Sequence, residues 1–170
     1  GSKIHMQSLG ALAHYDFNEP GVYSYEQAAD VIYKLGMGQK EIEQLYRRMV
    51  FNVIARNQDD HVKNISFLMD RKGSWSLSPA YDITYAYDKN NRWLAKHQMS
   101  INGKTDNYEK LDLEACASRM NIGKRRMEKI LEDVETAVSK WQDIAKTVGI
   151  RETIYNEIKS NFHYISRRDY

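Results

Sequence analysis

The sequence is poor in the residues that mark disulfide-bonded or irregular proteins. It holds one cysteine, Cys116, and two prolines in 170 residues. One thiol cannot form a disulfide within the chain, and a lone cysteine is more often a packing residue on a helix than a nucleophile. Proline interrupts helices, so its scarcity leaves long helices unbroken. The composition therefore favours a helical protein.

Long apolar runs are also missing. None approaches the roughly 20 residues that a membrane-spanning helix requires, and the first residues lack the basic and then apolar pattern of a signal peptide. We therefore expect a soluble, cytoplasmic protein without membrane contact. Gly1 and Ser2 could be a cloning remnant and carry no part of the argument. With 42% hydrophobic and 28% charged residues, residues 1–170 are predicted to form a single domain.

Positive and negative charges nearly balance over the whole chain. The formal net charge of +2 gives no general attraction to nucleic acid. Basic residues nevertheless cluster between Arg119 and Lys129, where Glu128 is the single acidic residue. Such a run is usually the solvated face of a helix, and contact with DNA phosphates is the alternative.

Helical signals dominate the first third of the chain. Ser24 to Gln27 has the pattern of a capping box, which predicts a helix that begins there. The helix should reach Leu35 and end at Gly36, because glycine readily adopts the left-handed conformation. From Gln39 to Ile54, apolar residues recur at the spacing of one buried helical face, which predicts a second helix.

The last third shows the same spacing. Residues Lys124 to Val148 are predicted to form one long helix that ends at Gly149. A last helix is expected further on, because apolar residues recur there at steps of four, four and three. These residues are Ile154, Ile158, Phe162 and Ile165.

Between these regions the sequence predicts a hairpin and loops. Residues 65–69 and 75–77 have the character of short strands, and the turn between them contains Gly73. Pro79 favours an extended conformation at Ser78, so residues 78–84 are expected to form a loop, as are residues 85–105. The predicted fold class is mainly α with one small β-hairpin.

The densest polar cluster runs from Asn57 to Asn64, and Asp82 follows 18 residues later, beyond the hairpin. Phosphoryl transfer with Mg²⁺ needs a carboxylate near the attacking hydroxyl and oxygen ligands for the metal. In protein kinases the catalytic Asp precedes a metal-binding Asn by five residues, and a second Asp follows a short hairpin. Asp59, Asn64 and Asp82 have this arrangement. Because Asp and Asn commonly serve turns, the residues alone indicate a metal and phosphate site without deciding it.

Six stretches of the first 105 or so residues resemble the carboxy-terminal domain of HipA proteins, and they occur in the family's order. They are Ile4 to Leu9, Ser24 to Gln27, Arg47 to Asn52, Asn57 to Asn64, Ser78 to Thr84 and His97 to Ser100. The pattern N-x-D-D-H-x-K-N followed by S-P-A-Y-D is more specific to that family than to kinases at large. The resemblance implies the helical carboxy-terminal lobe of a fold related to protein kinases.

The resemblance also implies an activity. HipA proteins are serine/threonine kinases that act as toxins of type II toxin–antitoxin modules and are linked to growth arrest and persistence. It implies the cofactors ATP and Mg²⁺ and a HipB-like, DNA-binding antitoxin as partner. The implied protein substrate is an aminoacyl-tRNA synthetase, which is the glutamyl-tRNA synthetase for the best-known member.

The matching motif positions assign roles to individual residues. Asp59 would be the catalytic base, and Asn64 and Asp82 would hold magnesium. Residues near the nucleotide would include His61, Lys63 and Tyr81. Each of these three has a plainer interpretation, since His61 could brace the loop, Lys63 could be solvated and Tyr81 could belong to the core.

The chain departs from the complete family pattern. No glycine-rich phosphate loop is found, so the amino-terminal nucleotide-binding lobe is expected to be absent and this chain alone to bind ATP poorly. One alternative is a non-catalytic helical module that docks the antitoxin or operator DNA, with the Arg119 to Lys129 patch as DNA contact. Another is a metal-dependent hydrolase built on Asp59, Asp60 and His61.

Overall fold

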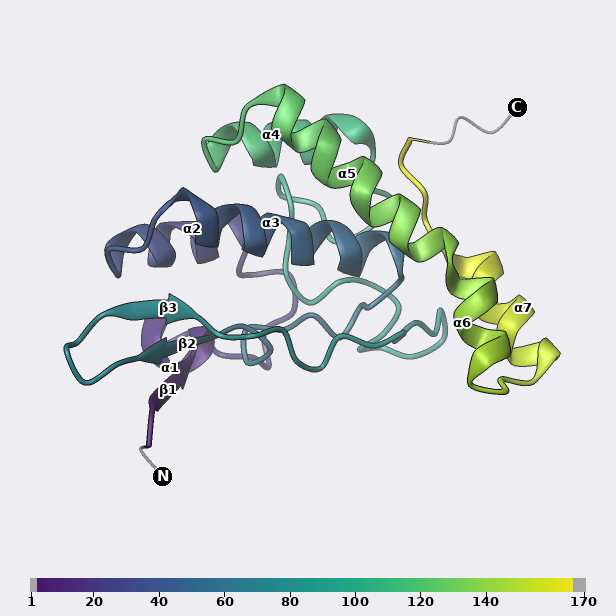
Figure 1. Cartoon of the computed structure of the whole chain (residues 1–170), viewed down its shortest axis with the longest axis horizontal. Coiled ribbons are helices and arrows are strands. Elements are labelled where there is room, and N and C mark those ends of the chain that lie inside the picture. Colours follow the sequence, from purple (N-terminus) through teal and green to yellow (C-terminus); the bar gives the residue numbers. More distant parts are fainter. Residues whose placement is uncertain (1–2, 167–170) are drawn as a thin grey trace.

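A small sheet and a set of helices share one apolar core in the computed structural model, which describes residues 3–166 (Figure 1). Gly1 and Ser2 lie outside the described residues. The elements, in chain order, are β1 (His5–Ser8), α1 (Leu9–Ala13), α2 (Tyr25–Lys34), α3 (Gln39–Ile54), β2 (Ser66–Met69), β3 (Trp75–Leu77), α4 (Lys110–Arg119), α5 (Lys124–Ser139), α6 (Trp141–Thr147) and α7 (Glu152–Asn161). The mainly α fold class is confirmed.

The central helix is α3, which packs against α2 on one side and α5 on the other. Its predicted apolar face is buried, with Ile42, Leu45 and Val50 fully shielded from solvent. The start of α2 also follows the prediction, because Ser24 and Gln27 exchange the two hydrogen bonds of a capping box. Gly36 takes the expected left-handed conformation after this helix, with a φ of 75°.

The sheet has three antiparallel strands in the order β1, β2, β3, whereas the sequence predicted only the hairpin of β2 and β3. His5 pairs with Met69 and Ser8 pairs with Ser66. A four-residue strand is too short to show a period of its own, and its register is set by a partner some 60 residues away in sequence. The strand β1 was therefore missed.

Two helices differ from the prediction. Helix α4 was not predicted, because small residues such as Cys116 and Ala117 form its buried face while Leu111 is 70% exposed on the outside. The single helix expected over residues 124–148 is divided at Lys140 into α5 and α6. No glycine or proline marks this division, so the sequence carried no signal for it.

The end of the chain folds back onto the core. Helix α7 ends at Asn161, so Phe162 and Ile165 lie beyond the last helix rather than within it, as had been expected. The backbone N–H of His163 donates to the carbonyl of Ile54 at 2.9 Å. The N–H groups of Ile165 and Ser166 both donate to Glu135 at 2.8 Å. These bonds attach the terminal segment to α3 and α5.

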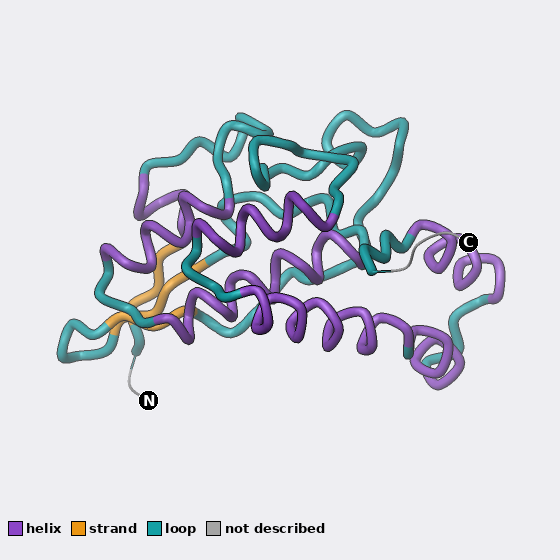
Figure 2. The backbone as a smooth tube through the Cα atoms, turned by 90° about the horizontal axis from the view of Figure 1, so that it is seen from above, coloured by secondary structure: helices purple, strands orange, loops and turns teal. Residues whose placement is uncertain are grey.

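Loops occupy most of one side of the molecule and helices the other (Figure 2). The expected loops at residues 78–84 and 85–105 contain no helix or named strand. Two isolated bridges join the 85–105 loop to other parts of the domain, one between Ser24 and Ser100 and one between Asn57 and Ala86. None of the helices within residues 3–166 combines the length and apolar character that crossing a bilayer demands.

Candidate active site

The polar loop from Asn57 to Asn64 follows α3 and leads into β2. The chain leaves the helix through Arg56, whose φ of 56° is left-handed. Gln58 N–H then donates to the carbonyl of Ala86 at 2.9 Å, and Ala86 N–H donates to the carbonyl of Arg56 at 3.0 Å. This backbone pairing places the segment that contains Asp82 alongside the loop that contains Asp59.

Asp60 anchors the loop from beneath. Its side chain is buried and accepts three hydrogen bonds of 2.8 Å, from the Tyr25 hydroxyl, from Nδ1 of His97 and from the backbone N–H of Gln98. Burial raises the pKa of Tyr25 well above its usual value, and the nearby Asp60 carboxylate adds to this. The Tyr25 hydroxyl therefore stays protonated and remains a donor to Asp60.

A chain of amide groups continues this network toward Asp82. Asn52 donates through Nδ2 to the Tyr25 hydroxyl at 3.0 Å and accepts through Oδ1 from Nδ2 of Asn57 at 3.0 Å. The same Asn57 nitrogen lies 3.4 Å from the backbone carbonyl of Asp82. Asp82 has a left-handed φ of 53° and its side chain is exposed. The buried network thus supports both halves of the site.

Asp59 lies next to Asp60 but points the other way, since 46% of its side chain is exposed. Its Oδ1 is 3.9 Å from Nε2 of His61. Burial is the largest cause that raises the pKa of Asp59; His61 opposes the shift, while the charges of Asp82 and Asp60 add to it. A carboxylate with a raised pKa is a stronger base, and it remains open to solvent.

Asn64 is oriented by its own loop. Its Nδ2 donates to the backbone carbonyl of Asp59 at 2.9 Å. The amide nitrogen is therefore engaged, which leaves Oδ1 as the group available to a ligand. Together with the exposed carboxylate of Asp82, this oxygen fits the preference of Mg²⁺ for a few protein oxygens completed by phosphates and water.

Tyr81 braces the site through its hydroxyl, which donates to the backbone carbonyl of Lys63. Because that hydroxyl has one proton, its second contact must be a hydrogen bond donated by the Ser66 hydroxyl. Tyr81 thus joins the loop of Asp82 to the loop of Asp59 and to β2. Its hydroxyl serves as a brace, which leaves the half-buried ring for contact with a ligand.

His61 and Lys63 meet an aromatic side chain that the sequence did not single out. The ammonium of Lys63 lies 3.0 Å from the centre of the Phe17 ring, and the His61 ring lies edge-on to Phe17 with centres 6.1 Å apart. Nδ1 of His61 is buried without a hydrogen-bond partner among the described residues. All six predicted site residues thus belong to two adjoining loops.

Comparison with known families decides the relationship of this chain. The sequence profile of the HipA-like C-terminal domain matches residues 2–141. The chain belongs to this family. The matched range contains both loops of the site and ends at the first residue of α6, so most of α6 and all of α7 lie beyond it.

The HipA-like domain also has a known structural relative. It superposes on a chain of the HipA, HipB and operator DNA complex of the toxin–antitoxin system from Shewanella oneidensis MR-1, with a TM-score of 0.75 over 93% of its length. The two chains are 17% identical, so the likeness concerns the fold. The domain spans 42% of that chain. No protein with curated annotation matches the sequence significantly.

One more charged side chain lies beneath the site of this HipA-like domain. Arg48 of α3 donates through one guanidinium nitrogen to the backbone carbonyl of Ser78, while its Nη1 is buried without a partner among residues 3–166. Burial lowers the pKa of Arg48, and the neighbouring Tyr81 opposes this shift. Periodicity alone would place Arg48 on an ordinary helix flank, so neither its burial nor its contact with Ser78 could be foreseen.

Asp60 cannot serve as a metal ligand, which argues against the interpretation as a metal-dependent hydrolase. Both carboxylate oxygens of Asp60 are engaged in the buried network, through hydrogen bonds from Tyr25, His97 and Gln98. Across residues 3–166, no three or more His, Cys, Asp or Glu side chains converge as a metal cage. Cys116 is buried and burial raises its pKa, as expected of a packing residue.

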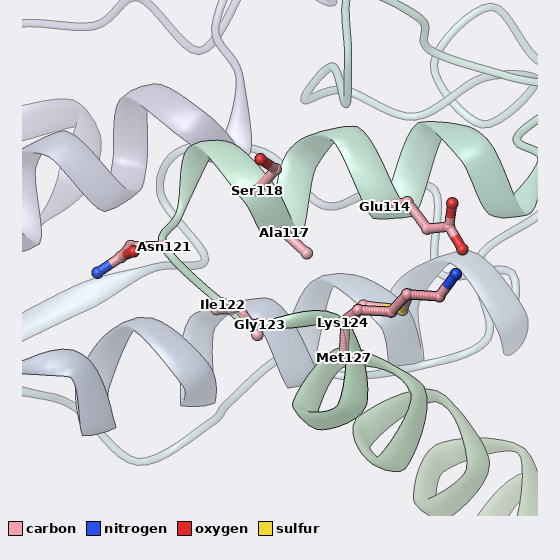
Figure 3. Close-up of a pocket in the computed structure, with 8 residues that line it drawn as sticks. All are labelled: Glu114, Ala117, Ser118, Asn121, Ile122, Gly123, Lys124 and Met127. Carbon is pink, nitrogen blue, oxygen red and sulfur yellow. The ribbon is translucent and has the colours of Figure 1, made fainter.

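The basic patch lies apart from these loops, at the start of α5. Arg126 pairs with Glu43 at 2.7 Å, and Lys129 pairs with Glu132 and Asp133 at 3.0 and 3.1 Å. A pocket of about 340 Å³ beside the patch lies between α4 and α5 (Figure 3), where the side chains of Glu114 and Lys124 are directed toward each other. Arg126 and Lys129 are therefore neutralised within the fold, whereas Arg119, Lys124 and Arg125 form no ion pair within residues 3–166.

Proposed function

We propose that this HipA-like domain is the catalytic lobe of a serine/threonine protein kinase that serves as the toxin of a type II toxin–antitoxin system. The reaction is the transfer of the γ-phosphate of ATP to a protein hydroxyl. The observation that carries the proposal is the arrangement of Asp59, Asn64 and Asp82 on two loops that are joined by backbone pairing and a buried polar network. Membership in the family supports the same assignment.

Each residue has a distinct task in this proposal. Asp59 orients the substrate hydroxyl and accepts its proton, a task favoured by its raised pKa and its exposure. The Oδ1 of Asn64 and the carboxylate of Asp82 would hold Mg²⁺, which when bound offsets the charge of the nucleotide phosphates. His61 and Lys63 would contact the nucleotide phosphates, and Tyr81 would pack on the nucleotide while its hydroxyl fixes the distance between the loops.

The partners follow from the same assignment. A HipB-like antitoxin and operator DNA are proposed because the structural relative belongs to a complex with both. The proposed substrate is an aminoacyl-tRNA synthetase, with glutamyl-tRNA synthetase as the first to test. The cytoplasm is the expected site of action, since ATP and tRNA synthetases are found there.

The decisive experiment replaces Asp59 by Asn in the longest natural protein that carries this domain. Removing the base should lower autophosphorylation from radiolabelled ATP by at least about 100-fold, with little effect on the circular dichroism spectrum. Asp88→Asn, on the exposed tip of the 85–105 loop, is the matched control and should retain activity. Wild-type phosphorylation by Asp59→Asn would rule out the assigned base.

A second candidate function is a docking module that binds antitoxin or operator DNA without catalysis. It is favoured by Arg119, Lys124 and Arg125, which are exposed and form no ion pair within residues 3–166. Under this alternative, binding of labelled operator DNA should weaken steeply with salt. Replacing Lys124 and Arg125 by Ala should then reduce DNA affinity while phosphoryl transfer by the parent protein is absent.

A further inference from the structure

Phe17 lies beside the polar loop of the site, in the connection between α1 and α2. Its side chain remains 39% exposed although it contacts two residues of the polar loop. The Lys63 ammonium lies 3.0 Å from the centre of its ring and the His61 ring meets its edge. The ring is only partly buried, and these two contacts join it to the polar loop.

The connection that presents Phe17 is fixed on both sides. Tyr15 and Tyr23 stack with their ring centres 4.2 Å apart, and Asp16 accepts the backbone N–H of Asn18 at 2.9 Å. Gly21 N–H donates to the carbonyl of Gln98 at 2.8 Å. Since Gln98 is itself bonded to Asp60, the segment of Phe17 shares its anchor with the catalytic loop.

The Phe17 ring contacts the charged end of the Lys63 side chain. A lysine side chain is long and loses much rotational freedom when it is held in one place. The negative face of an aromatic ring attracts an ammonium group with a strength below that of a charge-assisted hydrogen bond. One face of the ammonium meets the ring, while Lys63 as a residue is exposed, so its other N–H groups remain open to an anion.

We propose that Phe17 is a positioning residue that holds the Lys63 ammonium in place to receive the polyphosphate of a nucleotide. This inference rests on the proposed function, and it adds a residue that the family motifs do not contain. The ring holds the Lys63 side chain in place before the ligand binds, so the side chain loses less conformational entropy on binding. Leucine at position 17 would fill similar space without attracting the charge.

The test measures binding of Mg²⁺-tripolyphosphate by calorimetry to the longest natural protein that carries this domain, as in the Asp59 experiment. Phe17→Leu should weaken binding about two- to five-fold relative to the wild type. Phe17→Trp should bind as well as the wild type, because indole attracts cations best. In a Lys63→Met background the change at position 17 should have no effect. Trp93→Leu is the matched control, since Trp93 is also an exposed ring beside a cation, Arg92, but lies outside the site.

A second measurement reports the contact directly. Reductive ¹³C-methylation should give a Lys63 signal that the Phe17 ring shifts upfield, and Phe17→Leu should remove this shift. An unshifted Lys63 signal, or equal tripolyphosphate affinity for Phe17→Leu and the wild type, overturns the role of Phe17 alone. Failure of the wild type to bind tripolyphosphate at millimolar concentration removes the phosphate site itself, and the proposed function loses its support with it.

Discussion

The loop side and the helical side of this domain are held together by different forces. The loops around Asp59 and Asp82 depend on buried hydrogen bonds centred on Asp60, and they contain little regular structure. Helices α3 and α5 are in contact, and both bury apolar side chains in the core, such as Met49 and Ile130, which are fully buried. Apolar burial supplies stability in any orientation, whereas hydrogen bonds fix directions. The domain thus separates the part that provides stability from the part that sets geometry.

The largest effect on stability is expected from Ile130→Ala in the middle of α5, which tests the apolar core of the helical side. Removing a fully buried side chain leaves a cavity, so the free energy of unfolding should fall by about 2–5 kcal/mol. Urea denaturation measures the change. Ile144→Ala, at a side chain that is 51% exposed, should stay within about 0.5 kcal/mol of the wild type. Equal effects of the two substitutions would contradict the assigned role of the α3 and α5 contact.

Asp60→Asn tests the buried hydrogen bonds of the loop side. One oxygen acceptor becomes a donor that faces donor groups, so the free energy of unfolding should fall by about 1–3 kcal/mol. The backbone N–H of Gln98 should also exchange with deuterium much faster, an effect not expected from Ile130→Ala. Asp88→Asn is the control, because the Asp88 carboxylate accepts a hydrogen bond from the N–H of the exposed Asn90 and from no other group within residues 3–166. An unchanged exchange rate at Gln98 would show that Asp60 does not fix the loop.

The smallest expected effect concerns Asp59. Its pKa is raised in the folded state, chiefly by burial, so folding favours the protonated carboxyl. That stability is present below the unfolded pKa and is lost as the pH rises through the folded pKa. Asp59→Asn should therefore raise the melting temperature at pH 7, by no more than about 2 °C because water screens this exposed side chain.

Differential scanning fluorimetry across pH gives the sign of this last effect. The gain from Asp59→Asn should shrink toward pH 3, where the wild-type carboxyl is neutral in both states. Lower stability of Asp59→Asn at pH 7 would show that the carboxylate stabilises the fold, and a gain that persists at pH 3 would assign it to another cause.

The contrast between the loop side and the helical side also explains which features could be predicted from the sequence. Helices α2 and α3 and the turn at Gly73 were predictable because caps and apolar spacing are local signals. Strand β1 depends on a partner that is distant in sequence, which no local pattern records, and no glycine or proline marks the boundary between α5 and α6 at Lys140. Of the site, residue types and spacing identified Asp59, Asn64 and Asp82 as candidates. The bracing by Tyr81 and the contact between Phe17 and Lys63 depend on the tertiary fold.

The position of Asp60 has a consequence for how the site forms. Its three donors come from residue 25, before it in the chain, and from residues 97 and 98, well after it. During synthesis the polar loop would leave the ribosome long before the segment that fixes it. A nascent chain that ends before Gln98 would therefore hold all the charged groups of the loop without their final geometry, and the site would acquire a working arrangement only after that segment is synthesised.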